Sequence, residues 1–423
     1  MSLKKSLSIY GFFTLIEKGI DFFLLPIFTY YLTTYDYGIL ANVKLLLSIL
    51  YLFIALGGHH VLIIQYIHKK DTTFSTYLSS IYANAFISFL FIIASFILFQ
   101  EVIKDFLSIP IFWVYLLPIM ALFRVVIGMA FSYLQIDNQP KRFGLLSLGN
   151  LVLSASISLL LIVYYEFNYT GRLWSELMSG SLLAIGSLVL FYKSSFLTKK
   201  PSFTFMKEVI IIGLPLTSNA LSHLVMNSLD RFFISKMVSI EATGIYQVGY
   251  AVGSIILLVS MLFYRAWTPI LYRYLAKEEQ AYKIKIVKVS LLFLLSLGGF
   301  LPLLSFILSP FVFNHFIDAK FSTGQHYVFL IGLSYFWWAV FQVFGNVLYY
   351  YKRVQIFLRL GIFNVVVNAI LNYILIAQFG TIGAVYATLA SFMLLAFIVM
   401  IYSHRYYPLP WREGLHEIFQ LKI

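Results

Sequence analysis

Charged residues are scarce in this chain, and their placement constrains its fold more than any other feature. Of the 423 residues, 11% are Asp, Glu, Lys or Arg and 61% are hydrophobic. Most of the basic residues lie in short breaks between long apolar runs. A membrane-spanning helix needs about 20 apolar residues to cross about 30 Å of hydrocarbon. The pattern therefore predicts an all-α polytopic membrane protein with short connections.

Hydropathy and helix-breaking residues together predict about twelve transmembrane helices. The predicted spans are residues 8–32, 39–63, 77–99, 112–135, 143–164, 173–192, 208–234, 244–268, 287–309, 326–350, 358–378 and 383–402. The chain contains no Cys, which excludes a disulfide framework and a Cys-ligated metal site. No large domain is predicted outside the membrane, so function is expected within the spans.

The basic residues predict the orientation of the chain. They concentrate in every second break, whereas the alternate breaks hold only Lys104, Arg172, Lys236 and Lys320. Basic loops stay on the cytoplasmic side of a membrane, so both termini are predicted to be cytoplasmic. The net charge of +13 then reflects orientation, and no nucleic-acid partner is expected.

Two halves of the sequence resemble each other. One polar pattern recurs at an offset of 214 residues, and its members are Asn150, Ser154 and Ser158, then Asn364, Asn368 and Asn372. Because each half has an even number of spans, both would enter the membrane from the same side, as parallel repeats do. The alternative is chance similarity between apolar helices. We therefore predict two six-helix bundles around a central cavity. The predicted division is 1–192 (N-terminal bundle), 193–207 (basic cytoplasmic linker), 208–403 (C-terminal bundle) and 404–423 (cytoplasmic tail).

Some charged residues lie inside the predicted spans. Glu17, Lys18 and Asp21 share roughly one face of the first span. Each charge deep in a bilayer costs at least about 2.5 kcal/mol unless it is paired or faces water. These residues either form a Lys18–Asp21 pair that fixes helix packing or line a polar cavity, and the cavity is favoured.

Isolated cations occur in three other spans. Arg124 is near the middle of 112–135, while Lys44 and Arg265 lie close enough to helix ends for their charges to reach the interface. A cavity lined by Lys18, Arg124 and Arg265 would favour an anion. Guanidinium groups suit phosphate oxygens because they form bidentate, charge-assisted hydrogen bonds.

Polar stripes mark several spans. In 208–234 the stripe consists of Asn219, Ser222, His223, Asn227, Asp230 and Arg231. Hydrogen bonds between helices explain single Ser or Asn residues well. Stripes of two to three turns on several helices favour a hydrated interior instead, although both interpretations stay open.

Several sequence motifs resemble a known family. They are Lys-Lys-Ser-Leu-Ser-Ile-Tyr-Gly at 4–11, Pro26-Ile27 with Thr29 and Leu32, Asp36-Tyr37-Gly38, and Asp230-Arg231-Phe232-Phe233-Ile234 followed by Gly244-Ile245-Tyr246. Over essentially its whole length, the chain resembles the polysaccharide-biosynthesis flippases, the O-antigen and exopolysaccharide translocases of the multidrug/oligosaccharidyl-lipid/polysaccharide exporter superfamily. Related lipid flippases often have fourteen helices, so residues of an additional helix pair are not carried over.

The resemblance implies a non-enzymatic protein of the bacterial inner membrane. Such a protein moves an undecaprenyl-diphosphate-linked oligosaccharide from the cytoplasmic to the periplasmic leaflet by alternating access around a cationic cavity. The implied partners are the lipid-linked oligosaccharide and membrane lipids, with a polysaccharide polymerase and a chain-length regulator as further candidates. No cofactor or metal is expected, and coupling to a proton or sodium gradient stays open.

Two sets of residues are assigned to this function as hypotheses. The candidate substrate-binding residues are Lys18, Lys44, Arg124, Asn219, Asn227, Arg231, Arg265, Asn364 and Asn368. The candidate ion-coupling or charge-pairing residues are Glu17, Asp21, His223 and Asp230. One alternative is a multidrug or cation antiporter of the same superfamily, which predicts a cavity dominated by acidic and aromatic residues. A membrane-embedded glycan polymerase would require a large periplasmic loop, and none is predicted.

Overall fold

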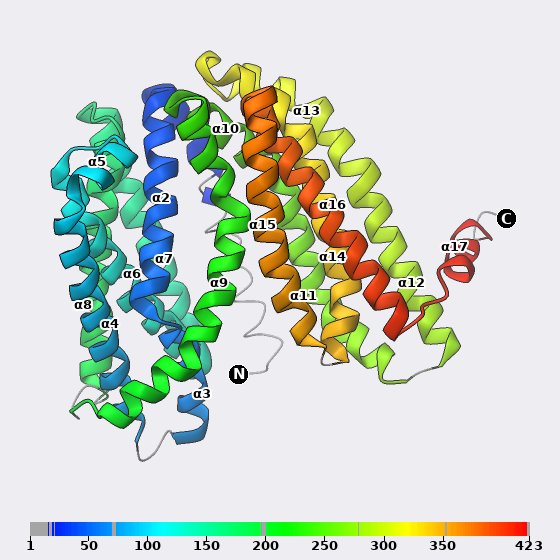
Figure 1. Cartoon of the computed structure of the whole chain (residues 1–423), viewed down its shortest axis with the longest axis horizontal. Coiled ribbons are helices and arrows are strands. Elements are labelled where there is room, and N and C mark those ends of the chain that lie inside the picture. Colours follow the sequence, from blue (N-terminus) through cyan, green and yellow to red (C-terminus); the bar gives the residue numbers. More distant parts are fainter. Residues whose placement is uncertain are drawn as a thin grey trace. The chain divides into compact units, whose positions relative to one another are not determined.

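The fold was taken from a computed structural model. It describes residues 16, 19–20, 22–69, 73–194, 196, 200–277, 279–351 and 353–420, with some side chains in these ranges left undescribed. Throughout this part of the chain the regular structure is helical, as Figure 1 shows. By their contacts the residues form two compact units, Met1–Val225 (the N-unit) and Met226–Ile423 (the C-unit).

The described part of the N-unit includes, near its start, the apolar helix Phe22–Tyr31. Its further helices are α2 (Thr34–Ala55), α3 (Gly58–Lys69), α4 (Phe74–Leu98), α5 (Gln100–Leu107), α6 (Ile111–Ile136), α7 (Pro140–Leu159), the π-helix η1 (Leu160–Tyr164) and α8 (Tyr169–Lys193). Helix α9 (Phe203–Met237) starts in this unit and ends in the C-unit.

The C-unit continues after α9 with further helices. They are α10 (Ile240–Gly253), α11 (Ile255–Leu275), α12 (Gln280–Leu295), the π-helix η2 (Ser296–Phe300), α13 (Leu301–His315), the 3-10 helix η3 (Ala319–Gly324), α14 (Gln325–Tyr350), α15 (Val354–Phe379), α16 (Thr381–Tyr406) and α17 (Trp411–Gln420). Helix α16 packs against both α14 and α15, and buried apolar side chains of these helices form much of the unit's core.

The prediction of a multi-pass membrane protein is confirmed. Among the described residues, ten helical segments are long and apolar enough to cross a membrane. They match ten of the predicted spans, α9 covers the predicted span 208–234, and the span 8–32 lies partly outside the described residues. The predicted span 39–63 is interrupted, because Leu56 and Gly57 adopt positive φ angles of 45° and 68° and separate α2 from α3.

The start of α2 explains one motif that the family resemblance relies on. Thr33 and Asp36 form a capping box: the Asp36 amide donates to Thr33 Oγ1 (3.1 Å), and the Thr33 amide donates to Asp36 Oδ2 (2.9 Å). Such reciprocal bonds satisfy amides that a helix start would otherwise leave unpaired. The Tyr169 amide also donates to Asp36 Oδ1 at 3.3 Å, so the same carboxylate links α2 to the start of α8.

The segment after α8 is attached to the N-unit. Asn84 of α4 donates to the Met206 carbonyl (2.9 Å), Gln65 of α3 donates to Glu208 (3.0 Å), and the rings of Tyr77 and Phe205 stack with centroids 4.1 Å apart. These contacts join the start of α9 to the N-unit, and the contact boundary between the units falls within α9. The linker is therefore packed along its described part, which its basic composition did not indicate. The division at 193–207 stays a prediction.

The C-terminal helix lies against α12. A Cβ at Gly414 would come within 2.3 Å of Val287 Cγ1, so the two helices approach closely at this glycine. Gln280 donates to Glu413 (2.9 Å), and Lys288 Nζ is 3.8 Å from a Glu417 oxygen. Just before α17, Tyr407 and Leu409 are buried in a cluster with residues of α11, α12 and α14, among them Trp267 and Leu271.

Candidate functional site

The C-unit contains a buried ion pair between two neighbouring residues of α9. Arg231 Nη1 donates to Asp230 Oδ1 at 2.9 Å, and the Arg231 amide donates to the same oxygen at 2.8 Å. The side chains are 9% (Arg231) and 5% (Asp230) exposed. A buried charge needs a partner and further hydrogen bonds to offset its lost hydration, and α10 and α14 supply them.

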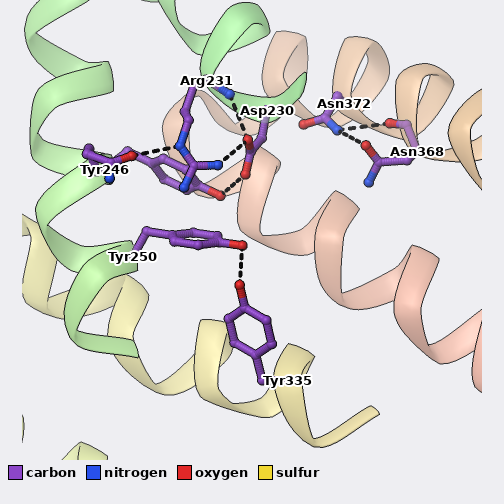
Figure 2. A network of polar contacts seen from close by, with 8 residues as sticks. Asp230, Arg231, Tyr246, Tyr250, Tyr335, Asn368 and Asn372 are labelled. Atoms are coloured by element: carbon purple, nitrogen blue, oxygen red, sulfur yellow. Dashed lines mark hydrogen bonds and ion pairs between the residues drawn. The ribbon is translucent and has the colours of Figure 1, made fainter. Parts of the chain in front are cut away.

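Three tyrosines and one glutamine complete this C-unit polar network, which consists of Asp230, Arg231, Tyr246, Gln247, Tyr250 and Tyr335. Figure 2 shows Arg231 held between the Asp230 carboxylate and side chains of α10. Arg231 Nε donates to Gln247 Oε1 at 2.7 Å, and its Cζ lies 4.1 Å from the centroid of the Tyr250 ring, a cation–π contact. The Tyr246 hydroxyl donates to Asp230 Oδ2.

The network extends from α10 to α14. The hydroxyls of Tyr250 and Tyr335 form a hydrogen bond of 2.5 Å, drawn in Figure 2. The spacing of Tyr246, Gln247 and Tyr250 places all three on the side of α10 that meets Arg231. These contacts support the predicted charge-pairing role for Asp230. Arg231 remains a predicted substrate ligand, but here its guanidinium is directed at groups of its own unit.

The amides of α15 also contact neighbouring helices. Asn368 Nδ2 donates to Ser391 Oγ of α16 (3.0 Å), and Asn372 Nδ2 donates to Asn368 Oδ1 (3.0 Å). Asn364, Asn368 and Asn372 are each at most 1% exposed. Among the described residues neither polar atom of the Asn364 amide has a hydrogen-bond partner. The bonds of Asn368 and Asn372 favour the interhelical interpretation of this stripe over cavity lining.

The matching stripe in the N-unit joins α7 to α8. Ser158 Oγ donates to Ser175 Oγ (2.8 Å), and Ser175 Oγ lies 3.4 Å from Ser154 Oγ. Arg172, which the sequence placed in an outside connection, donates to Ser158 Oγ at 2.9 Å and lies over the Phe28 ring, 5.0 Å from its centroid. This cation therefore turns inward to the helix interface.

A second ion pair connects α6 and α8 in the N-unit. Arg124 Nε donates to Glu176 Oε1 at 2.6 Å, and Nη2 contacts the same oxygen. The side chains are 33% (Arg124) and 31% (Glu176) exposed, so this pair is far more open than the one in the C-unit. Glu176 lies in the predicted span 173–192. The charge is thus compensated within a candidate membrane span, and about one third of each side chain is exposed.

Helix α2 borders this N-unit ion pair. The Tyr51 hydroxyl lies 3.1 Å from the position that a Cβ at Gly128 would take, one turn after Arg124. Lys44 is exposed on α2, where Ser48 Oγ donates to its carbonyl at 2.8 Å. Lys44, Ser48 and Tyr51 are spaced to share one face of α2. Among the predicted cations whose side chains the structure describes, Arg124 is partly exposed and Lys44 is exposed.

Other predicted residues lie outside what the structure describes. These are the residues Glu17, Lys18 and Asp21, and the side chains of Asn219, His223, Asn227 and Arg265. Their assigned roles remain predictions.

Sequence reasoning missed several members of both sites. Glu176 carried a usable signal, because it is an acidic residue inside an apolar run like those singled out elsewhere. Tyr250 and Tyr335 carried none, since the chain has 31 Tyr residues and an aromatic side chain is ordinary in a membrane span.

Comparison with solved structures shows which known folds this one is similar to. The fold is similar to an inward-facing MATE family multidrug resistance transporter of the MOP superfamily, with a TM-score of 0.70, 14% identity, and coverage of 92% of this chain and 97% of that one. It is also similar to the lipid II flippase MurJ, with a TM-score of 0.75, 16% identity, and coverage of 96% and 89%. The Vibrio cholerae MATE transporter VcmN in its bent form gives a TM-score of 0.57 at 11% identity, with coverage of 95% and 93%. At these identities the likeness establishes the fold alone.

The sequence itself matches a family model. Residues 3–275 match the polysaccharide biosynthesis protein family, and residues 215–374 match the MatE family. No curated protein matches the chain in sequence. Because the first match covers well over half of the 423 residues, this chain belongs to the polysaccharide biosynthesis protein family.

Proposed function

We propose that this protein is a flippase of the bacterial inner membrane. It carries an undecaprenyl-diphosphate-linked oligosaccharide from the cytoplasmic to the periplasmic leaflet by alternating access, for synthesis of O-antigen, capsule or exopolysaccharide. The observation that carries the proposal is Arg124, an accessible guanidinium inside a membrane span of a polysaccharide biosynthesis protein. A diphosphate headgroup needs such a cation, because guanidinium binds phosphate oxygens through charge-assisted hydrogen bonds.

The remaining site residues take supporting roles in this proposal. Lys44 adds a second accessible cation on α2, while Lys18 and Arg265 stay candidate ligands. Asp230 pairs with Arg231 and holds α9 to α10 through Tyr246. Both termini lie in the cytoplasm. A polysaccharide polymerase and a chain-length regulator would act on the delivered glycan.

A multidrug or cation antiporter is the second candidate. The MatE match over residues 215–374 and the MATE-like fold favour it. Such a transporter would use acidic residues to bind a cation, yet Asp230 and Glu176 are each paired with Arg. An antiporter predicts altered drug resistance on deletion with surface glycan unchanged, whereas the flippase predicts the reverse.

The flippase proposal is tested in proteoliposomes that hold the purified chain and a fluorescent lipid-linked oligosaccharide. We expect the label to become accessible to a membrane-impermeant quencher on the opposite face, and Arg124→Ala to slow this step at least about tenfold. The Glu101→Gln variant, which disrupts an exposed pair with Lys104, serves as the control with unchanged transport. Equal rates for liposomes with and without protein would refute the proposal.

A further inference from the structure

In the N-unit ion pair, Glu176 binds one particular edge of the Arg124 guanidinium. Nε and Nη2 lie on one edge of the Arg124 guanidinium, and both are directed at Glu176 Oε1. That edge is one of the two through which a guanidinium can bind a phosphate bidentately, the other being Nη1 and Nη2. Glu176 therefore occupies one of these two edges, and an anion that binds Arg124 through the same edge must displace it.

The combination of exposure and position inside a span separates this pair from the other described ion pairs. Arg231–Asp230 is almost completely buried. The pairs Lys104–Glu101, Lys288–Glu417 and Lys320–Asp318 lie outside the predicted spans or at their ends. Within the described residues, Arg124–Glu176 thus combines a position inside a span with side chains about one third exposed. A solute that reaches this surface can compete for Arg124 without unfolding the unit.

We propose that Glu176 is a resident anion that exchanges with the substrate's diphosphate on Arg124, an inference that rests on the proposed flippase function. Without substrate the carboxylate compensates the guanidinium. When the diphosphate arrives it takes the same edge, and Glu176 becomes free to turn toward the exposed surface. Return of Glu176 to Arg124 then helps to expel the diphosphate. Arg124 has an anionic partner in both states, while the displaced Glu176 carboxylate must be hydrated at the exposed surface, because an unpaired charge within the membrane is costly.

This exchange makes Glu176 a determinant of affinity and of turnover. A resident competitor weakens apparent binding, because only the fraction of protein in which this edge of Arg124 is free can bind the anion. The apparent Kd equals the intrinsic Kd divided by that free fraction. Removing its charge should strengthen anion binding and slow release. A carboxylate that only fixes α6 to α8 would affect stability and leave anion affinity unchanged.

The test uses the full-length protein in phosphatidylcholine nanodiscs and measures binding of inorganic pyrophosphate by calorimetry. We expect Glu176→Gln, which keeps the size of the side chain, to bind pyrophosphate about tenfold more tightly than the wild type, equivalent to about 1.4 kcal/mol. Arg124→Ala/Glu176→Gln should lose this gain, and Glu101→Gln should match the wild type. In proteoliposomes, Glu176→Gln should bind lipid-linked oligosaccharide but translocate it more slowly.

The outcomes distinguish this inference from the function on which it rests. Unchanged pyrophosphate affinity in Glu176→Gln, with normal flipping by the wild type, overturns the exchange and leaves the flippase intact. Absence of flipping by the wild type overturns both. The swapped pair Arg124→Glu/Glu176→Arg should be more thermally stable than either single substitution, but it should not transport. If it transports as well as the wild type, the pair has only a structural role and the exchange is refuted. If added phosphatidylglycerol abolishes the gain in Glu176→Gln, the anion is a bilayer headgroup and the exchange is refuted.

Discussion

Two arginines inside the predicted membrane spans show how strongly a residue's role depends on its surroundings. Both Arg124 and Arg231 pair with a carboxylate. Arg231 is 9% exposed and is also bound by Gln247 and the Tyr250 ring, whereas Arg124 is 33% exposed. The contacts of Arg124 thus leave room for a proposed substrate to reach it. The contacts of Arg231 instead form a structural clamp between α9 and α10.

Removing one partner of the buried clamp should destabilise the protein. Asp230→Asn leaves the Arg231 charge without its carboxylate, and breaking a buried pair in this way typically costs about 3–5 kcal/mol. We expect a clear fall in the midpoint of thermal unfolding in detergent. Tyr335→Phe removes only the hydroxyl bond to Tyr250 and should cost about 1 kcal/mol. An Asp230→Asn protein as stable as the wild type would show that the clamp is dispensable.

The sequence predicted these sites only in part. Arg124, Asp230 and Arg231 could be singled out because charge inside an apolar run is costly wherever it lies. Their partners depend on which helices meet. Gln247 and Tyr335 lie 16 and 104 residues after Arg231 in the chain, and no local pattern connects them to it. The burial that separates a clamp from an accessible cation is likewise a property of packing.

At the scale of elements, the break between α2 and α3 is fixed by two glycines. A Cβ at Gly57 would lie 2.5 Å from the Gly213 carbonyl oxygen, and a Cβ at Gly213 would lie 1.9 Å from the Leu56 carbonyl oxygen. Gly57 also has a φ of 68°, which L-residues with side chains rarely adopt. Helix α9 can approach this break only because both positions lack a side chain.

A single methyl group at Gly213 should therefore disturb the N-unit. We expect Gly213→Ala to lower the yield of folded protein and its thermal midpoint, because a backbone carbonyl cannot move aside as a flexible side chain does. Gly149→Ala is the matched control, since nothing lies within 4 Å of a Cβ there, and helix propensity should make it neutral or slightly stabilising. Size-exclusion profiles of fluorescent fusions measure both. Equal profiles would contradict the close approach.

Helix positions were largely predictable from the sequence, whereas interruptions were not. Long apolar runs set the length of a span regardless of the neighbours, so α4, α6 and α16 lie where the hydropathy indicated. The break at Leu56 and Gly57 occurs inside one such run, and Leu56 gives no signal for its left-handed φ. The packing of residues 200–213 against α3 and α4 was not predictable either, because it depends on contacts between residues far apart in the chain.

For the whole molecule, the distribution of basic residues predicts a definite orientation. A green fluorescent protein fused after residue 423 should fluoresce, because that end is predicted to be cytoplasmic, where this reporter folds. Alkaline phosphatase inserted at Glu166, in the connection between η1 and α8, should be active because it would be periplasmic. The reverse pattern of activities would contradict the orientation and exclude the proposed direction of transport.

The cluster around Trp267 has a consequence for synthesis of the protein. Tyr407 and Leu409 help to bury Trp267 and Leu271, yet they follow them by well over one hundred residues in the chain. At about 5–20 residues per second, translation leaves the earlier side chains without these partners for on the order of ten seconds. During that interval the nascent C-unit has an apolar surface that chaperones or insertion factors would need to shield. Substitutions among the last twenty residues would therefore first reduce the yield of inserted, folded protein.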